Sequence, residues 1–347
     1  MSVLKKIIVS FLVLILVAST LVGCGEKTPE ANEASNPNNE EQQLEKIVVS
    51  ELRSEFWLPV YLADELGYFK EEGLDVEFVT YKDGPLAFQG MHAGDSQFCM
   101  LSSEPVLRAY DQGKESKIIL STLTNKPYMF VTSPEIKSVK DLKGKVIFGG
   151  MPGSAPYSFV ASILASEGLD PEADVTWANL EYGASLAALE SGQIVGSYIR
   201  STAKTEVAQM GGNILVDATI ADSHKKLYGS DKYESTIVTV TKKYAEENPE
   251  TVQKFTNAVV RAIIWQTENT DEEVARVATP VFPGKSYINA KLIEYLRSSL
   301  SVDGNISEEG HNTIIDFCLK EGLISSPIPY EDVIDTSFVK KSYQQFK

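Results

Sequence analysis

Residues 59–78 read PVYLADELGYFKEEGLDVEF, and this stretch predicts a helix that turns into a strand. Pro59 suits the first turn of a helix, and Gly67 can take the left-handed conformation that ends one. Apolar residues recur around this segment at helical spacing: Leu58, Leu62, Leu66 and Phe69. A second glycine, Gly73, allows the turn into the next apolar run, which holds Val76 and Phe78. The stretch therefore indicates an α/β fold.

The same alternation of short apolar runs and helical patterns continues along the chain. Strands are expected at 47–49, 76–78, 97–101, 118–123, 128–132 and 145–148, and near Val175, Ile194 and Ile214. Helices are expected at 59–66, after 103, at 157–167, 184–191 and 203–210, from Pro249 onward, and at 291–300 and 307–320. This order predicts mainly parallel sheets covered by helices on both faces.

The first residues have the features of a secretion signal. Lys5 and Lys6 precede an apolar run from Ile7 to Val17 that is short for a bilayer span, and Leu21-Val22-Gly23-Cys24 follows. This ending resembles the bacterial lipoprotein box, which implies cleavage after residue 23 and a lipid on the Cys24 thiol. The alternative is a transmembrane helix with a chance cysteine at its end.

Composition limits the partners of the chain. The net charge is −16, and loss of Lys5 and Lys6 with residues 1–23 would move it to −18. An acidic surface disfavours nucleic acid and anionic lipid, so we expect no nucleic-acid partner and attachment to a membrane only through the lipid. Residues 24–46 are rich in Glu, Asn, Pro and Gln, which predicts a flexible tether with the folded part starting at Ile47.

Cysteine and histidine are too sparse to predict a metal site or a cofactor. Cys99 and Cys318 lie inside apolar runs, which favours buried thiols, although a disulfide between them stays open. No CxxC pair occurs, and the three histidines are scattered: His92, His224 and His311. We therefore expect no metal and no cofactor.

Several motifs together carry a family resemblance. Residues 59–63, 65–76 (ELGYFKEEGLDV), 93–98 (AGDSQF), 103–105 (SEP) and 138–145 (SVKDLKGK) follow in this order. The set resembles the nitrate, sulfonate, taurine and thiamine-pyrimidine branch of ABC-transporter substrate-binding proteins. The resemblance covers most of the chain after the tether.

The resemblance implies the periplasmic-binding-protein type 2 fold, with two α/β lobes joined by two hinge crossings. Lobe one would combine 47–132 with 238–347, and lobe two would hold 133–237, with crossings near Ser133 and Ser235. The ligand is expected between the lobes, at the carboxyl ends of strands and the N-termini of helices. It also implies a monomer on the outer face of the cell membrane that delivers a small molecule to an ABC permease and its ATPase.

Two segments of lobe one supply candidate ligand-binding residues. After the first strand, Arg53 could pair with an anionic group and Ser54 could donate a hydrogen bond, while Phe56 and Trp57 could stack on a flat ligand. Packing of Trp57 against the next helix is the alternative. The second segment lies at a helix N-terminus, where capping is an equal explanation, and comprises Ser102, Ser103 and Glu104.

Two further segments belong to lobe two. GGMPGSAPY, residues 149–157, lies between a strand and a helix, so Gly153, Ser154 and Tyr157 are candidates, although a tight turn alone could require these glycines. The last candidates are Tyr182, Tyr198 and Arg200. Here the sequence departs from the branch, because Val195-Gly196 stands where an aspartate followed by a small residue is common.

The residue supply favours an aromatic or heterocyclic ligand, an organic acid or a sulfonate over inorganic nitrate. Three other functions compete with import. A lipoprotein of this fold could sense a ligand or dock a partner without transport. Ser154 stands where a hydrolase nucleophile would, but 152–156 (PGSAP) does not match GxSxG. A pyrimidine-synthesising enzyme shares the fold, but its cysteine-rich iron-site motif is absent from this sequence.

Overall fold

The computed structural model describes residues 43–282 and 288–347. The predicted signal, the lipidation site Cys24 and nearly all of the tether lie outside the described residues. Strand pairing begins at Glu45, two residues before the expected start of the folded part at Ile47. Within the described ranges, no helix combines the length and the apolar character that a membrane crossing needs.

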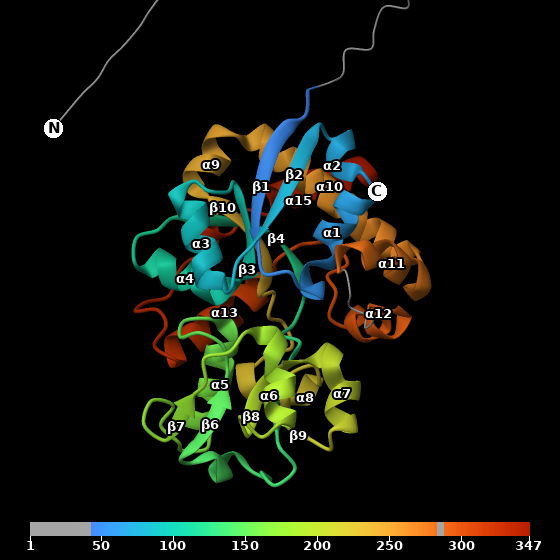
Figure 1. Cartoon of the computed structure of the whole chain (residues 1–347). Helices are drawn as coiled ribbons and strands as arrows, with labels where there is room; N and C mark the ends of the chain where they lie inside the picture. The colour runs from blue at the N-terminus through green and yellow to red at the C-terminus, as the bar shows by residue number, and fades with distance from the viewer. Residues whose placement is uncertain (1–42, 283–287) are drawn as a thin grey trace, which may run out of the picture. The chain divides into compact units, whose positions relative to one another are not determined.

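The first sheet has the strand order β2–β1–β3–β10–β4 (Figure 1). Its strands are β1 (Glu45–Glu51), β2 (Leu74–Thr80), β3 (Phe98–Ser102), β4 (Ser116–Leu123) and β10 (Thr236–Thr241). Strands β2 and β3 run parallel to β1, whereas β10 runs antiparallel to both β3 and β4. Four strands therefore share one direction, and β10 alone is reversed among them.

The second sheet has the same arrangement, in the order β7–β6–β8–β5–β9. Its strands are β5 (Tyr128–Thr132), β6 (Lys145–Phe148), β7 (Val175–Trp177), β8 (Gly196–Arg200) and β9 (Asn213–Asp217). Strands β7 and β8 pair parallel to β6, and β5 pairs antiparallel to β8 and β9. The predicted mainly parallel sheets are confirmed, each with one reversed strand.

Both reversed strands follow a segment that connects the sheets. Residues 124–127 join β4 to β5, and residues 229–235 lead from α8 (Ala221–Tyr228) to β10. We expected the first crossing near Ser133, but β5 pairs with β8 and β9, so the connection lies before Tyr128. The apolar run 128–132 suits a central strand of either sheet, and only its pairing partners decide the sheet.

Helices flank the first sheet on both sides, with α3 and α4 on one side and α1, α10 and α11 on the other (Figure 1). Of the helices around the first sheet, those that precede the second sheet in the sequence are α1 (Leu58–Glu65), α2 (Tyr68–Glu71), α3 (Gly84–Ala93) and α4 (Ser103–Asp111). After β10 they are α9 (Lys242–Glu247), α10 (Pro249–Glu268), α11 (Asp271–Ala278), α12 (Ala290–Arg297), α13 (Glu308–Lys320), α14 (Tyr330–Val333) and α15 (Ser337–Phe346).

The long helix α10 anchors the core beside the first sheet. Its predicted apolar stripe is fully buried: Val252, Phe255, Val259 and Ile263. The Phe255 ring stacks on Phe98 of β3 with centroids 4.0 Å apart. Cys99 and Cys318 are buried, free thiols, and burial raises the pKa of Cys318 to about 12. The expectation of buried thiols is therefore confirmed, and the disulfide is not formed.

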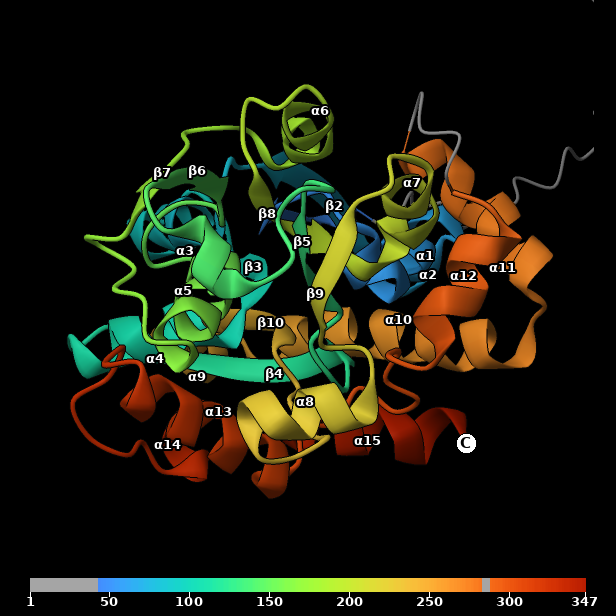
Figure 2. The same ribbon diagram turned by 90° about the horizontal axis from the view of Figure 1, so that it is seen from below.

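Shorter helices surround the second sheet, namely α5 (Ala155–Ser166), α6 (Ser185–Glu190), α7 (Lys204–Gln209) and α8. Single 3₁₀ turns complete the chain: η1 (Glu55–Trp57), η2 (Val139–Leu142), η3 (Tyr182–Ala184), η4 (Ser201–Ala203) and η5 (Thr279–Val281). Helix α8, which the sequence patterns did not predict, lies beside α13 (Figure 2), where Tyr228 packs on Phe317 at a centroid distance of 5.2 Å.

Candidate functional site

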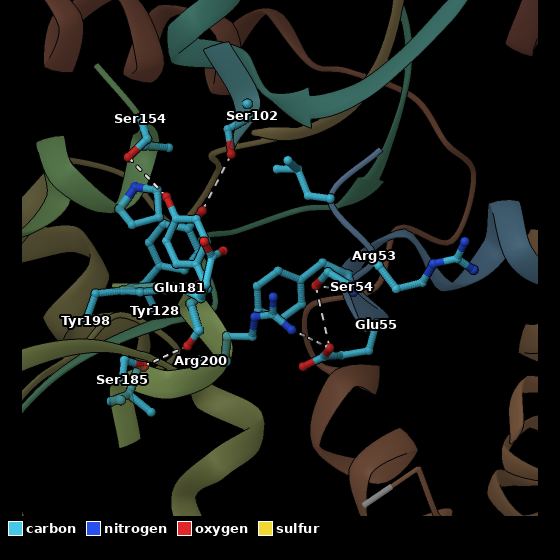
Figure 3. Close-up of a pocket in the computed structure, with 18 of the residues that line it drawn as sticks. Arg53, Ser54, Glu55, Ser102, Tyr128, Ser154, Glu181, Ser185, Tyr198 and Arg200 are labelled. Atoms are coloured by element: carbon cyan, nitrogen blue, oxygen red, sulfur yellow. Dashed lines mark hydrogen bonds and ion pairs between the residues drawn. The ribbon is translucent and has the colours of Figure 1, made fainter. Parts of the chain in front are cut away.

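A cavity of about 470 Å³ lies where strands of both sheets end. The reversed strands β5 and β10 begin at the edge at which their neighbours finish, so strand ends and helix N-termini meet there. The first sheet contributes residues 52–57, Thr80, Tyr81, Lys82, Gly84, Ser102 and Pro105. The part of the chain around the second sheet contributes Tyr128, 154–156, 181–183, Ser185, Leu186, 198–200, Thr202, Ala203 and Glu206. Figure 3 shows this cavity.

Nine of the thirteen residues singled out in the sequence line this cavity. They are Arg53, Ser54, Phe56, Trp57, Ser102, Ser154, Tyr182, Tyr198 and Arg200. Each of the four predicted segments thus contributes at least one wall residue. The other four residues, Ser103, Glu104, Gly153 and Tyr157, are not among the residues that line it.

These four residues have structural partners instead. The Ser103 hydroxyl donates to the Glu234 carbonyl at 3.2 Å, and Glu104 pairs with Lys126 behind the cavity wall. The Tyr157 ring packs on Trp177 with centroids 4.4 Å apart. Gly153 has a φ of 86°, and a side chain there would meet Arg108. A position at the start of a helix was therefore not enough to predict which of two neighbouring residues lines the cavity.

Aromatic rings form much of the wall. Tyr128 meets Tyr198 edge-on with centroids 4.7 Å apart, and Tyr198 lies 6.1 Å from Tyr182. Phe56 faces Tyr128 from the first sheet at 6.3 Å. The Trp57 indole, only 3 % exposed, donates to the Ile237 carbonyl at 3.0 Å. Fixed rings of this kind present flat apolar surface to a ligand.

Arg53 is held away from the aromatic wall. Its backbone φ is 40°, and within the described ranges no other residue except glycine has a positive φ. Its Nε donates to Glu51 Oε1 at 2.9 Å, and its guanidinium lies 5.3 Å from the centroid of the Tyr61 ring. Figure 3 shows the side chain directed away from Tyr128 and Tyr198. The Glu51 carboxylate at the end of β1 therefore compensates the charge of the Arg53 guanidinium.

Arg200 pairs across the cavity. Its Nη1 lies 2.9 Å from Oε2 of Glu55, which belongs to η1 after β1. The Thr202 hydroxyl donates to the other oxygen of the same carboxylate at 2.7 Å. Glu55 is 1 % exposed and takes both of these partners from the chain around the second sheet. The ion pair thus joins the two sides of the cavity.

Three further charged residues line the cavity: Lys82, Glu181 and Glu206. Lys82 lies 3.1 Å from Glu181 in a second, more exposed ion pair between the two sides. The Oε2 atom of Glu206 is buried and has no hydrogen-bond partner among the described residues. The lining cations Arg53, Lys82 and Arg200 are therefore matched by the carboxylates of Glu55, Glu181 and Glu206, with Glu51 in addition beside Arg53.

The two helix N-termini at the cavity already use several donors. Ser154 caps α5 by accepting from the Tyr157 amide at 3.4 Å, and its hydroxyl also accepts from Tyr182 at 3.2 Å. The Ser103 amide of α4 donates to the Ser235 carbonyl at 3.0 Å. Pro105 and Pro156 sit in these first turns and have no N–H to offer. At each of these two turns, one amide is therefore already paired and one position has no N–H.

The cavity wall around Ser154 holds no histidine that could act as a general base. The structure describes all three histidines, and none lines the cavity. His92 contacts Ser116, His224 contacts Ser230, and His311 contacts Ile328.

Within residues 43–282 and 288–347, no group of three or more His, Cys, Asp and Glu side chains is arranged to hold a metal ion.

Several wall residues were not among the sequence candidates. The most informative are Glu55, Tyr128, Glu181 and Glu206. Glu55 stands between the candidates Ser54 and Phe56, so its place in the sequence was a usable signal. Tyr128 is the first residue of β5, directly after the connection 124–127. Its place at the cavity could have been predicted if that connection had been known. Nothing in the local sequence marks Glu206.

The two sheets and the cavity at their strand ends define the periplasmic-binding-protein fold, in which two α/β halves enclose a site. A model of the family described as NMT1/THI5 like matches residues 56–273. Because this match spans more than half of the chain, the chain belongs to the NMT1/THI5-like family.

Relatives and solved structures agree with this placement. A Bacillus subtilis protein that is named, provisionally, for binding aliphatic sulfonates is 27 % identical over 346 residues, 96 % of each chain. The formylaminopyrimidine-binding protein of Halalkalibacterium halodurans is 26 % identical over 219 residues, 61 % of this chain and 63 % of that protein. A solved structure from Bordetella bronchiseptica RB50 has a TM-score of 0.78 at 23 % identity, covering 87 % of this chain and 98 % of the other.

The same fold also occurs in a catalytic protein. The solved desulfurization enzyme DSZB has a TM-score of 0.62 at 14 % identity, covering 87 % of this chain and all of that chain. The fold is therefore shared by binding proteins and an enzyme, and the residues of the site must separate the two.

Proposed function

We propose that this chain is the extracytoplasmic solute-binding component of an ABC importer, which captures a small organic molecule in the cavity and delivers it to a permease and its ATPase. The observation that carries the proposal is a cavity of about 470 Å³ lined from both sheets, which two short connections join, 124–127 and 229–235. Two halves joined by short connections can close on a ligand by a hinge motion. The binding-protein names of the relatives support the same function.

The proposal includes a lipid anchor. Cleavage before Cys24 and acylation of its thiol would hold a monomer on the outer face of the cell membrane, with residues 24–46 as the tether. Its test is fractionation of cells that carry the wild-type chain or Cys24→Ser. We expect the variant to leave the membrane fraction and to lose incorporation of labelled palmitate. Retention in the membrane without label would point to the alternative, an uncleaved transmembrane helix.

Binding is tested on residues 24–347. A ligand that binds only the folded state raises the melting temperature, so we expect a shift with at least one compound from a panel of sulfonates, nitrate, pyrimidines, flavins and aromatic acids and amides. Uptake of that compound should then require the chain and the permease in cells. No shift with any compound, together with unchanged uptake after deletion, contradicts the proposal.

The competing functions give different results in the same experiments. A sensor or docking lipoprotein would bind the compound while deletion left its uptake unchanged. An enzyme would convert the compound, which mass spectrometry of the incubated mixture detects. The histidine-free cavity around Ser154 supports binding over turnover.

A further inference from the structure

We infer that the cavity selects an uncharged aromatic ligand and that Glu55 sets this selection by neutralising Arg200. The inference rests on the proposed function, since it concerns which small molecule the same cavity accepts. It separates the aromatic alternative from the organic acid and sulfonate alternatives, which the sequence left open.

The first step concerns the charge of the wall. A cavity for an anion needs positive charge that the protein itself does not compensate. Here Arg200 lies 2.9 Å from Glu55, Arg53 lies 2.9 Å from Glu51, and Lys82 lies 3.1 Å from Glu181. An anionic ligand would therefore compete with a carboxylate at every one of these cations.

The second step concerns burial. Glu55 is 1 % exposed, and its two oxygens are taken by Arg200 and Thr202 at 2.9 and 2.7 Å. Moving Arg200 toward an anionic ligand would leave this buried carboxylate poorly compensated, which is costly. The Lys82–Glu181 pair is more exposed, and water screens it better. Glu55 is thus the carboxylate that weighs most against an anion.

The third step concerns what the cavity does offer. Flat rings line it on both sides, with Phe56 and Trp57 from the first sheet and Tyr128 and Tyr198 from the second. The carboxylates of Glu181 and Glu206 also belong to the lining, where they can accept hydrogen bonds and would repel an anion. An uncharged aromatic or heteroaromatic molecule that carries an N–H or O–H donor matches this combination.

The test uses matched pairs of compounds that differ in charge: benzamide and benzoate, nicotinamide and nicotinate, and benzenesulfonamide and benzenesulfonate. We expect the wild-type chain to be stabilised more by the uncharged member of the pairs that bind. Mass spectrometry of any molecule carried through purification gives a second readout and should identify an uncharged aromatic compound.

Glu55→Gln removes one negative charge beside Arg200 and keeps the side-chain shape. We expect the ratio of the Kd of the anion to the Kd of the uncharged partner to fall about tenfold or more. A ratio is used because the substitution also weakens the pair across the cavity and can weaken all ligands alike. Glu181→Gln is the matched control, with the same change of charge at the exposed pair and a smaller expected change in the ratio.

The double variant Glu55→Gln with Arg200→Gln removes both charges and should return the preference to the uncharged compounds. It also serves if the single variant does not fold. Tighter binding of the anions to the wild-type chain would overturn the inference and leave the proposed function intact. The absence of binding by these pairs and by the wider panel, together with unchanged uptake after deletion, would count against the proposed function and this inference together.

Discussion

The ammonium group of Lys126 pairs with the Glu104 carboxylate in a site where both side chains are fully enclosed. Lys126 lies in the connection 124–127, and Tyr233 in the connection 229–235 donates to the same carboxylate at 2.9 Å. Rings of Tyr128, Tyr228, Tyr233 and Phe317 surround the ammonium at 4.5–5.9 Å from their centroids. One buried ion pair therefore fixes both connections to α4.

Lys126→Met should destabilise the fold strongly, because it leaves the Glu104 carboxylate buried without its cation. Loss of one partner of a buried pair typically costs about 3–5 kcal/mol. The double variant Lys126→Met with Glu104→Gln removes both charges and should recover part of this loss. Urea unfolding followed by circular dichroism measures both. Equal losses in the single and double variants would show that the charge pairing is not what holds this site.

His224 should make the fold sensitive to acid. Burial lowers the pKa of its imidazole below the usual 6.5, and the geometry fixes the neutral form. Nδ1–H donates to the Ser230 carbonyl at 2.6 Å, while Nε2 accepts from the Lys126 amide at 3.4 Å. As the pH falls below 6.5, the imidazole is protonated in the unfolded chain but stays neutral in the folded chain. The free energy of unfolding therefore falls by up to about 1.4 kcal/mol per pH unit.

The measurement compares urea unfolding of the wild-type chain and His224→Gln at pH 7.5, 6.0 and 5.0. The variant should start less stable, because glutamine cannot reproduce both hydrogen bonds, and should lose less between pH 7.5 and 5.0. His92 and His311, whose pKa values burial also lowers, keep the remaining acid sensitivity in both proteins. Identical pH profiles would assign the acid sensitivity to groups other than His224.

Trp57→Ala should weaken ligand binding strongly, since the indole is both a wall of the cavity and a buried residue. The same change should lower stability by about 3–5 kcal/mol through the space it leaves. Trp57→Phe is the matched variant, because it keeps a ring and loses the hydrogen bond to the Ile237 carbonyl. Calorimetric titration under conditions where each variant stays folded separates the two effects. Unchanged affinity in the alanine variant would assign Trp57 to the core alone.

Gly150→Ala should disturb the cavity through Tyr182. Gly150 has a φ of 89°, and a β-carbon there would collide with the Tyr182 hydroxyl group and approach Ser154 Oγ at 2.9 Å. Backbone strain alone costs about 1–3 kcal/mol, and displacement of the ring should weaken binding as well. Gly168→Ala is the control, because that position has a similar φ of 82°, has open space around it and does not line the cavity. Similar affinities for the two variants would contradict this role of Tyr182.

Much of the fold was accessible from the sequence because its signals are local. The helix bounds predicted from Pro59 and Gly67 agree with the structure within one or two residues, and the predicted apolar stripe of α10 is buried. The partner of a central strand is not a local property, and the expected crossing near Ser133 was wrong for this reason. Helix α8 has few apolar residues, with His224 and Tyr228 buried, so no apolar stripe indicated it.

The cavity was accessible in outline because wall residues follow strand ends. Sequence position cannot show where a side chain points, so Ser102 lines the cavity and its neighbour Ser103 does not. Nor can it show which charges meet, since Glu55 and Arg200 are 145 residues apart. The candidates therefore included both arginines, with Arg53 as the partner of an anionic group, while the structure places a carboxylate beside each.

The place of β10 between β3 and β4 has a consequence for biosynthesis. These two strands are each bonded to β10 rather than to one another, and β10 ends at Thr241. A growing chain must therefore wait for the whole second sheet to be translated before the first can close. Until then the edges of β3 and β4 stay open to wrong pairing. The strand order thus delays closure of the first sheet until the chain has been made as far as Thr241.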